Sequence, residues 1–153
     1  MSAFDLTGRT AIVTGANTGI GQAIAVALAG AGAKLALVGR SPMDETRARI
    51  PAETLEITAD LGTLAPIDGI VSEVVDWAGG IDILVNNAGI IRRADALDFI
   101  EADWDAVMDV NLKSVFFLSQ AVARTMLAGS GGKIVNIASL LSFQGGIRIP
   151  SYT

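Results

Sequence analysis

Short apolar runs alternate along the chain with longer stretches in which apolar residues recur with a helical period. Five runs have the length and composition of strands and lie at residues 11–13, 34–38, 55–59, 81–85 and 133–139, and the run at 34–38 has the composition of a buried strand. Apolar positions at i, i+3, i+4, i+7, i+8 and i+11 from Ile20 and from Ile67 predict helices over 20–31 and 67–78. A long helix over 101–128 and a short solvated helix within 42–51 complete the pattern. Strands that alternate with helices predict an α/β fold built on a parallel sheet.

The composition narrows the function classes. A chain of 153 residues, 51% of them hydrophobic, is long enough for one compact domain with a substantial core. Its net charge of −5 offers no basic surface for nucleic acid or anionic lipid, so we expect a small-molecule partner. The chain has no cysteine and no histidine, which removes disulfides, thiol nucleophiles, His-based triads and the usual metal ligands. We therefore expect acid–base chemistry from other groups.

The N-terminal segment and the longest apolar run bear on localisation. Residues 1–6 have no basic group before an apolar stretch, so we expect no secretory signal. The run at 23–33 is too short to span a bilayer and contains two glycines that favour helix ends. These features predict a cytoplasmic protein.

A glycine-rich turn at residues 14–21, Thr-Gly-Ala-Asn-Thr-Gly-Ile-Gly, joins the first predicted strand to the first predicted helix. Such a turn needs glycine because a Cβ would keep a pyrophosphate away from the main chain. The helix that follows offers free N–H groups and the positive end of its dipole. The spacing is not G-x-G-x-x-G, and it is not a P-loop, because Gln22 and Ala23 follow Gly21. The turn predicts a bound dinucleotide, with a ligand-free tight turn as the alternative.

Two further positions point to specific contacts. The end of the second strand faces the adenosine ribose in dinucleotide folds. Gly39 lacks the acid that would repel a 2′-phosphate and Arg40 follows it, which favours NADP, with an exposed loop arginine as the alternative. Asn111 lies on the apolar stripe of the long helix, formed by Trp104, Val107, Met108, Val115, Leu118 and Val122. A lone amide in an apolar face needs partners, so a specific hydrogen-bonding duty is expected for Asn111, with a buried structural amide as the alternative to a catalytic one.

Four motifs, in order, resemble the short-chain dehydrogenase/reductase family. They are T-G-x-x-x-G-I-G at 14–21, N-N-A-G at 86–89, the run Asn-Leu-Lys-Ser at 111–114, and Ser139 with Tyr152 thirteen positions later. The resemblance implies a three-layer, Rossmann-like, doubly wound parallel sheet, and the five strands are expected in the order 3-2-1-4-5. It also implies an oxidoreductase that uses NAD(P)(H). For Asn86 and Asn87, a cofactor wall and a structural brace are equally good interpretations.

The resemblance assigns roles to particular residues. It implies catalysis by Asn111, Ser139 and Tyr152: the phenol exchanges a proton with the substrate oxygen, the serine positions that oxygen, and the asparagine helps hold a relay water. It implies cofactor contacts from the glycine turn, two strand ends and the N-N-A-G stretch, namely Gly15, Asn17, Thr18, Gly19, Ile20, Gly21, Arg40, Asp60, Leu61, Asn87, Ala88 and Gly89. Asp60 has turn capping as an alternative role, and Ser139 has a role as a turn residue or helix cap. The choice between NAD and NADP stays open, and we hypothesise that both are accepted.

The family's lysine lies outside the chain. A phenol has a pKa of about 10 and needs a neighbouring cation to act near pH 7; in the family, a lysine four residues after the tyrosine supplies it. The chain ends at Thr153, so we expect a single NAD(P)-binding domain at 1–153 that is C-terminally incomplete and inactive alone. The alternative is a half-domain that binds a nucleotide, or another chain, without catalysis.

Residues 90–97 and 142–148 resemble a group within the family, the 2-deoxy-D-gluconate 3-dehydrogenases, which implies a deoxy sugar-acid substrate. Another carbonyl reductase of the family, such as a 3-oxoacyl reductase, is the alternative. A carboxylate substrate suits a bidentate arginine, so the substrate candidates are Arg92, Arg93 and Arg148, with Gln144 beside them. Surface positions are the alternative for all three arginines. The resemblance and exposed aromatics at 116–117 also predict a homodimer or homotetramer.

Overall fold

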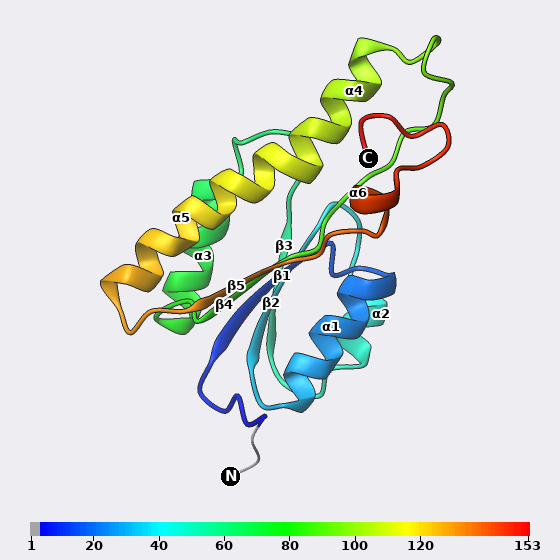
Figure 1. Cartoon of the computed structure of the whole chain (residues 1–153). Coiled ribbons are helices and arrows are strands. Elements are labelled where there is room, and N and C mark those ends of the chain that lie inside the picture. The colour runs from blue at the N-terminus through cyan, green and yellow to red at the C-terminus, as the bar shows by residue number, and fades with distance from the viewer. Residues whose placement is uncertain (1–3) are drawn as a thin grey trace.

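A five-stranded parallel sheet forms the centre of the computed structural model, which describes residues 4–153 (Figure 1). Residues 1–3, part of the segment for which no secretory signal is expected, lie outside that range. The strand order is β3-β2-β1-β4-β5, which confirms the predicted sheet. The strands are β1 (Thr10–Thr14), β2 (Lys34–Gly39), β3 (Thr54–Thr58), β4 (Ile83–Asn86) and β5 (Lys133–Asn136).

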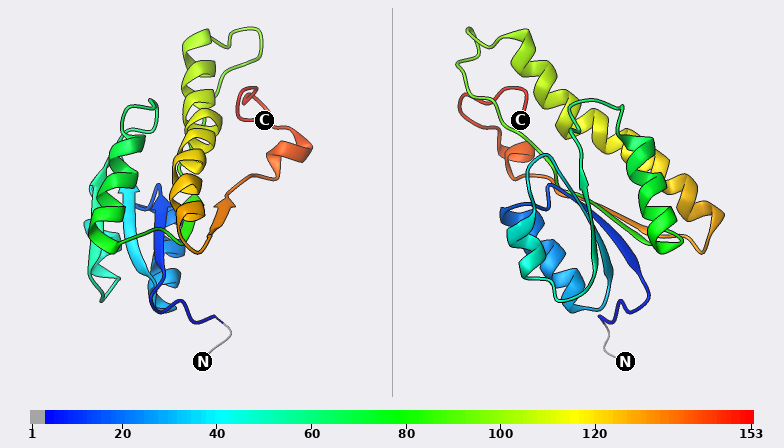
Figure 2. Two further views of the ribbon diagram at one scale, coloured as in Figure 1. Left: turned by 90° about the vertical axis from the view of Figure 1, so that its left-hand side faces the viewer. Right: turned by 180° about the vertical axis from the view of Figure 1, so that it is seen from behind.

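Helices cover both faces of the sheet and make three layers, as predicted (Figure 2). On one face lie α1 (Gly19–Gly30) and α2 (Asp44–Ala48); α3 (Ile67–Ala78) and α5 (Ser114–Ala128) cover the other. The remaining helical segments are α4 (Glu101–Met108), η1 (Asp109–Lys113) and α6 (Leu141–Gln144). Within residues 4–153, none of these helices combines the length and the apolar character that crossing a membrane requires.

Alternation along the central strand divides the core between the two faces. Ile12 points into the cluster formed with α3 and α5, whereas Ala11 and Val13 point into the cluster formed with α1. All three side chains are fully buried. Because successive residues of a strand face opposite sides, a strand buried on both faces is apolar throughout, which is why the runs of β1 and β2 show no polar alternation. The edge strand β3 does alternate, with Glu56 and Thr58 exposed, and β5 is exposed along its length.

The predicted helix over 101–128 is interrupted by a π-helical turn. α4, η1 and α5 follow one another directly, and η1 contains Asn111. The predicted stripe is wrong at Trp104, which is 45% exposed because the first turns of α4 project beyond the sheet (Figure 1). Buried positions that the stripe omits are Val110, Ser114 and Met126. A π turn holds more residues per turn than an α-helix, so a regular 3.6 period does not reveal it.

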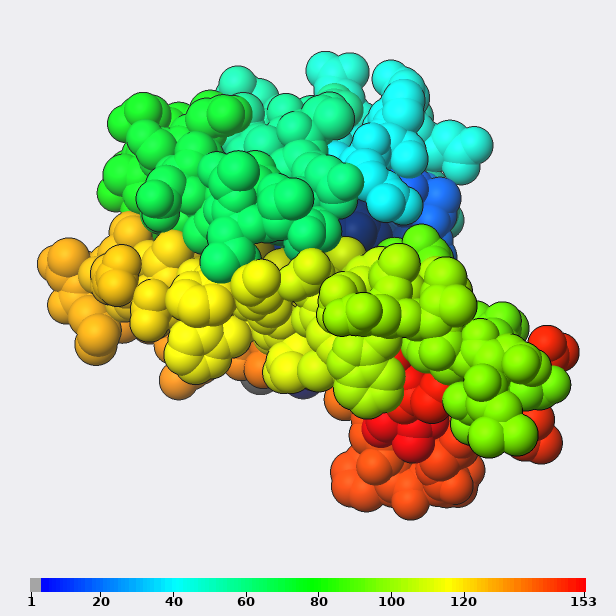
Figure 3. All heavy atoms as spheres, turned by 90° about the horizontal axis from the view of Figure 1, so that it is seen from above, coloured from blue at the N-terminus to red at the C-terminus, as the bar shows by residue number. Residues whose placement is uncertain are grey.

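The fifth strand is shorter than predicted, ending at Asn136 instead of 139, so Ser139 lies three residues beyond it. Residues 139–153 then form α6 and a series of turns that protrude from the rest of the molecule beside the 91–100 segment (Figure 3). One backbone hydrogen bond joins the two segments, from the Ala94 N–H to the Arg148 carbonyl at 3.1 Å. Most of the 90–97 stretch and all of the 142–148 stretch, which resemble the 2-deoxy-D-gluconate 3-dehydrogenases, lie within these two segments.

The burial of Leu84 yields a test of this core. Leu84 on β4 is fully buried, whereas Leu97 is fully exposed. We expect Leu84→Ala to lower the free energy of unfolding by about 2–5 kcal/mol, because it leaves a cavity beneath α5. The matched variant Leu97→Ala should change it by less than about 0.5 kcal/mol. Denaturant unfolding of the purified protein measures both; equal losses would contradict the described core.

Candidate active site

The glycine-rich turn between β1 and α1 approaches the end of β4 closely. Gly15 and Gly19 have φ values of +64° and +57°, a region that side chains disfavour. At Gly21 the constraint is space: a Cβ there would collide with the Gly15 carbonyl oxygen and the Asn87 amide nitrogen. Space is also limited at Gly15, since a Cβ there would lie 3.0 Å from the Ala88 Cα. The glycines at 15 and 21 are therefore needed for packing as well as for conformation.

Two side chains join this turn to β4. The buried Thr14 hydroxyl oxygen accepts the backbone N–H groups of Asn87 at 3.0 Å and Ala88 at 2.9 Å. The Asn87 side-chain amide donates to the carbonyls of Thr14 at 3.0 Å and Gly15 at 3.3 Å. Thr14 was not among the candidate residues, and its only sequence signal is its place at the start of the glycine motif. Together these bonds make the turn and the β4 end one unit.

The first turn of α1 is suited to an anion. Its N-cap, Thr18, makes no side-chain capping bond, and the first turn contains no acidic residue. The initial N–H groups of a helix need partners, and the helix dipole favours negative charge at that end. Open space also surrounds Gly19, where an added Cβ would meet nothing within 4 Å. The chain's own residues thus fit a phosphate group at this position.

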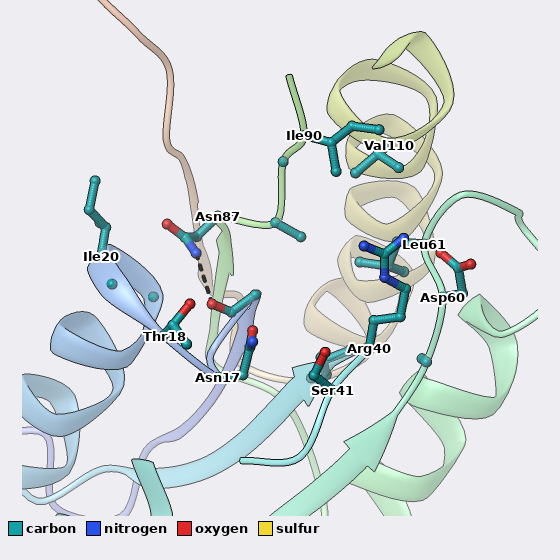
Figure 4. Close-up of a pocket in the computed structure, with 18 residues that line it drawn as sticks. Asn17, Thr18, Ile20, Arg40, Ser41, Asp60, Leu61, Asn87, Ile90 and Val110 are labelled. Carbon is teal, nitrogen blue, oxygen red and sulfur yellow. Dashed lines mark hydrogen bonds between the residues drawn. The ribbon is translucent and has the colours of Figure 1, made fainter. Parts of the chain in front are cut away.

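A cavity of about 420 Å³ opens between the turn and the carboxyl ends of the strands (Figure 4). It is lined by all twelve predicted cofactor residues, Gly15, Asn17, Thr18, Gly19, Ile20, Gly21, Arg40, Asp60, Leu61, Asn87, Ala88 and Gly89. Arg40 is exposed at its edge and makes no ion pair within residues 4–153. Asp60 lines the cavity while its carboxylate accepts the Gly62 N–H at 2.9 Å, so the turn-capping role is present as well.

The two asparagines of the N-N-A-G stretch make different contacts. Asn86 is buried, and its amide donates to the Ser119 hydroxyl and the Asn136 side-chain oxygen, both at 2.9 Å. Asn86 thus braces β4 against α5 and β5. Asn87 braces the glycine turn and also lines the cavity, which combines the two interpretations left open by the sequence.

A second cavity of about 510 Å³ adjoins the first and shares residues 87–90 and Ile20 with it. The three predicted catalytic residues, Asn111, Ser139 and Tyr152, all line it. The Ser139 hydroxyl oxygen accepts the Leu141 N–H at 3.2 Å, a local turn contact just before α6, whose N-cap is Leu140 and has no side-chain capping bond. That bond uses a lone pair and leaves the hydroxyl proton free to donate to a bound oxygen.

Asn111 has the specific hydrogen-bonding duty expected of it. Its side-chain oxygen accepts the Ile90 N–H at 2.8 Å, and its amide nitrogen donates to the Ile90 carbonyl at 2.8 Å. This two-point contact fixes η1 to the segment that separates the two cavities. The partner of Asn111 is the backbone of a residue 21 positions earlier, which no local pattern indicates.

The four substrate candidates lie away from the two adjoining cavities, since Arg92, Arg93, Gln144 and Arg148 line neither of them. Arg92 pairs with Asp103 at 3.2 Å, and Arg148 pairs with Asp95 at 2.9 Å. Arg148 also has a φ of +63°, within the left-handed region. The ion pairs hold the 92–95 segment to α4 and to residue 148, and recognition of a substrate carboxylate by these arginines stays a prediction.

The sheet order and the glycine turn at its carboxyl edge define a Rossmann-like α/β protein. The sequence also assigns the family, because the family model for short chain dehydrogenases matches residues 9–153. The chain belongs to the short chain dehydrogenase family.

Relatives and solved structures agree with this membership. The chain is 53% identical to the 2-dehydro-3-deoxy-D-gluconate 5-dehydrogenase of Escherichia coli, over 100% of the chain and 62% of the relative. It is 50% identical to the Bacillus subtilis enzyme of the same name, over 99% of the chain and 61% of the relative. A candidate 2-deoxy-D-gluconate 3-dehydrogenase from Agrobacterium tumefaciens, solved with bound NADP, superposes with a TM-score of 0.89 at 52% identity, covering 99% of this chain and 61% of that one. The chain thus spans about three fifths of the length of these relatives.

The close approach at Gly21 predicts a strong effect of one methyl group. We expect Gly21→Ala to lower the free energy of unfolding by about 1–3 kcal/mol through overpacking, and to weaken nucleotide binding at the displaced turn. Gly30→Ala is the matched control, because a Cβ at Gly30, also in α1, meets nothing within 4 Å. That change should be neutral or stabilising by about 1 kcal/mol. Calorimetric titration with NADPH and thermal unfolding compare the two; normal binding by Gly21→Ala would contradict the described turn.

Proposed function

We propose that this protein is a nicotinamide-dependent oxidoreductase that transfers a hydride between NAD(P)(H) and the hydroxyl or keto carbon of a deoxy sugar acid. The observation that carries the proposal is the junction of the two cavities: one is lined by the predicted cofactor residues, and the other by Asn111, Ser139 and Tyr152. Relatives named as 2-dehydro-3-deoxy-D-gluconate 5-dehydrogenases support the substrate class. The names of these relatives give carbon 5 as the oxidised position, whereas a similar structure carries the name of a 3-dehydrogenase.

The first cavity would hold the dinucleotide. The first turn of α1 would bind the pyrophosphate through backbone N–H groups, with the glycines of the turn allowing close approach. Arg40 would face the adenosine 2′ position, and Asp60 with Leu61 would flank the adenine. When bound, the cofactor supplies a hydride acceptor or donor at its nicotinamide ring.

The second cavity would hold the substrate. The free hydroxyl proton of Ser139 would bind the substrate oxygen, and the Tyr152 phenol would give that oxygen a proton in reduction and take it back in oxidation. Asn111 would keep the 87–90 segment in place between the two cavities and help hold a relay water. The protein would be a cytoplasmic homodimer or homotetramer. A subunit interface on α5 is supported by Phe116 and Phe117, whose side chains are 60% and 38% exposed.

Removing the Tyr152 hydroxyl tests the proposed acid. In the full-length protein, Tyr152→Phe should lower kcat for reduction of a keto-deoxy sugar acid by about 100-fold or more, the usual share of a general acid. The Kd for NADPH should stay within about twofold, because Tyr152 lies in the second cavity and not in the first. Steady-state rates at the nicotinamide absorbance band measure turnover. Unchanged kcat would show that another group is the acid.

Reversing the charge at Arg40 tests cofactor preference. We propose that both cofactors are accepted and that Arg40 supports NADP, so Arg40→Asp should reduce kcat/KM with NADPH about tenfold or more and leave NADH turnover unchanged or faster. Arg93→Asp makes the same change of charge at an exposed residue that lines neither of the two adjoining cavities. That control should affect both cofactors equally. Equal NADPH kinetics before and after Arg40→Asp would refute the role of Arg40.

A further inference from the structure

Helix α2, expected to be solvated, contains a fully buried threonine. Thr46 has no exposed surface, and its hydroxyl donates to the Ala16 carbonyl at 2.7 Å, with the Asn17 carbonyl at 3.3 Å. The same oxygen accepts the side-chain amide of Gln22 on α1 at 3.0 Å. A hydroxyl has one proton to donate and lone pairs to accept, so Thr46 is satisfied in both directions. It links α2 to the glycine turn and to α1.

The segment that carries Arg40 lies directly before α2. Only residues 41–43 separate Arg40 from the first residue of α2, and Met43 is 2% exposed. A Cβ on Gly39 would lie 3.3 Å from the Met43 sulfur and 3.6 Å from the Asn17 side-chain oxygen. The last residue of β2, Gly39, thus packs between Met43, which directly precedes α2, and Asn17 of the glycine turn. A shift of α2 would move Arg40 relative to that turn.

The other polar contacts of α2 and of its C-cap residue, Arg49, are exposed to solvent. Arg47 pairs with Glu56 at 3.2 Å with its side chain 65% exposed, and the Arg49 guanidinium donates to the Gln22 side-chain oxygen at 2.7 Å in an exposed contact. Exposed contacts of this kind contribute little to the free energy of unfolding, because water competes for the same groups. A buried hydroxyl whose removal leaves two polar groups unpaired is a stronger constraint. Thr46 is the buried polar anchor of α2.

We propose that Thr46 is a positioning residue that sets selectivity at the adenosine 2′ position, by holding the Arg40–Ser41 segment at a fixed distance from the glycine turn. The inference rests on the proposed nucleotide binding. Displacing the glycine turn would weaken NADH and NADPH alike, since both carry the pyrophosphate. Displacing Arg40 weakens only the ligand with a 2′-phosphate, because a charge-assisted contact depends on geometry. The ratio of the two affinities therefore separates positioning from a general structural role.

The experiment compares the Kd of NADPH with that of NADH by fluorescence titration of the full-length protein. Thr46→Val removes the hydroxyl at nearly constant volume and should lower the ratio Kd(NADH)/Kd(NADPH) about tenfold, the effect of one charged hydrogen bond. Thr46→Ser retains the hydroxyl and should keep the ratio within about twofold of the wild type. Thr54→Val is the matched control, because the Thr54 hydroxyl is buried without a partner within residues 4–153. It should leave the ratio unchanged.

Gln22→Met provides a second variant in case Thr46→Val unfolds, as thermal melting would show. It removes the amide that donates to Thr46 and should shift the ratio in the same direction by a smaller factor. An unchanged ratio in the folded Thr46→Val protein, or in Gln22→Met if Thr46→Val does not fold, would overturn the inference and leave the proposed function intact. If the wild type binds neither NADPH nor NADH, the proposed function fails and this inference fails with it.

Discussion

The close contact between the glycine turn and the end of β4 is the constraint on which the rest of the site depends. The Thr14 hydroxyl oxygen accepts the N–H groups of Asn87 and Ala88, and the Asn87 side-chain amide donates to the Thr14 carbonyl in the turn. Gly21 lies so close to these groups that no Cβ fits between them. Because the buried polar groups satisfy one another, separating the two segments would expose several unpaired donors and acceptors. These bonds therefore fix the turn beside the first cavity.

The segment at 87–90 is held from both sides. Thr14 fixes its first half to β1, and Asn111 in η1 fixes Ile90 through two hydrogen bonds. The same segment lines both cavities, so it forms the wall along which a nicotinamide ring and a substrate would meet. Reaction geometry in a hydride transfer depends on such fixed placement. The π-helical turn belongs to this arrangement, since it contains the residue that makes the second clamp.

Much of this fold could be predicted, because strands buried on both faces and helices with one apolar face leave direct marks on the sequence. The alternation of strands and helices followed from these marks, whereas the strand order and the three layers followed from the resemblance of the motifs to the short-chain dehydrogenase family. Two of the missed features depend on partners distant in sequence: Thr14 bonds to residues 73 and 74 positions away, and Thr46 bonds to a carbonyl 30 positions away. A short polar helix such as α2 gives no sign that one of its side chains is buried. The π turn was missed because it holds more residues per turn than the regular helical period by which the sequence was interpreted.

The central claim is that a dinucleotide binds along the carboxyl edge of the sheet, between the glycine turn and the ends of β2 and β4. Hydrogen–deuterium exchange of the protein with and without saturating NADPH tests this claim directly. The account predicts slower exchange in peptides that cover residues 14–21, 39–41 and 87–90, which line the first cavity or adjoin it. Protection confined to residues 79–82 and 129–131, which line a separate cavity between the ends of α3 and α5, would contradict it. So would the absence of any protection.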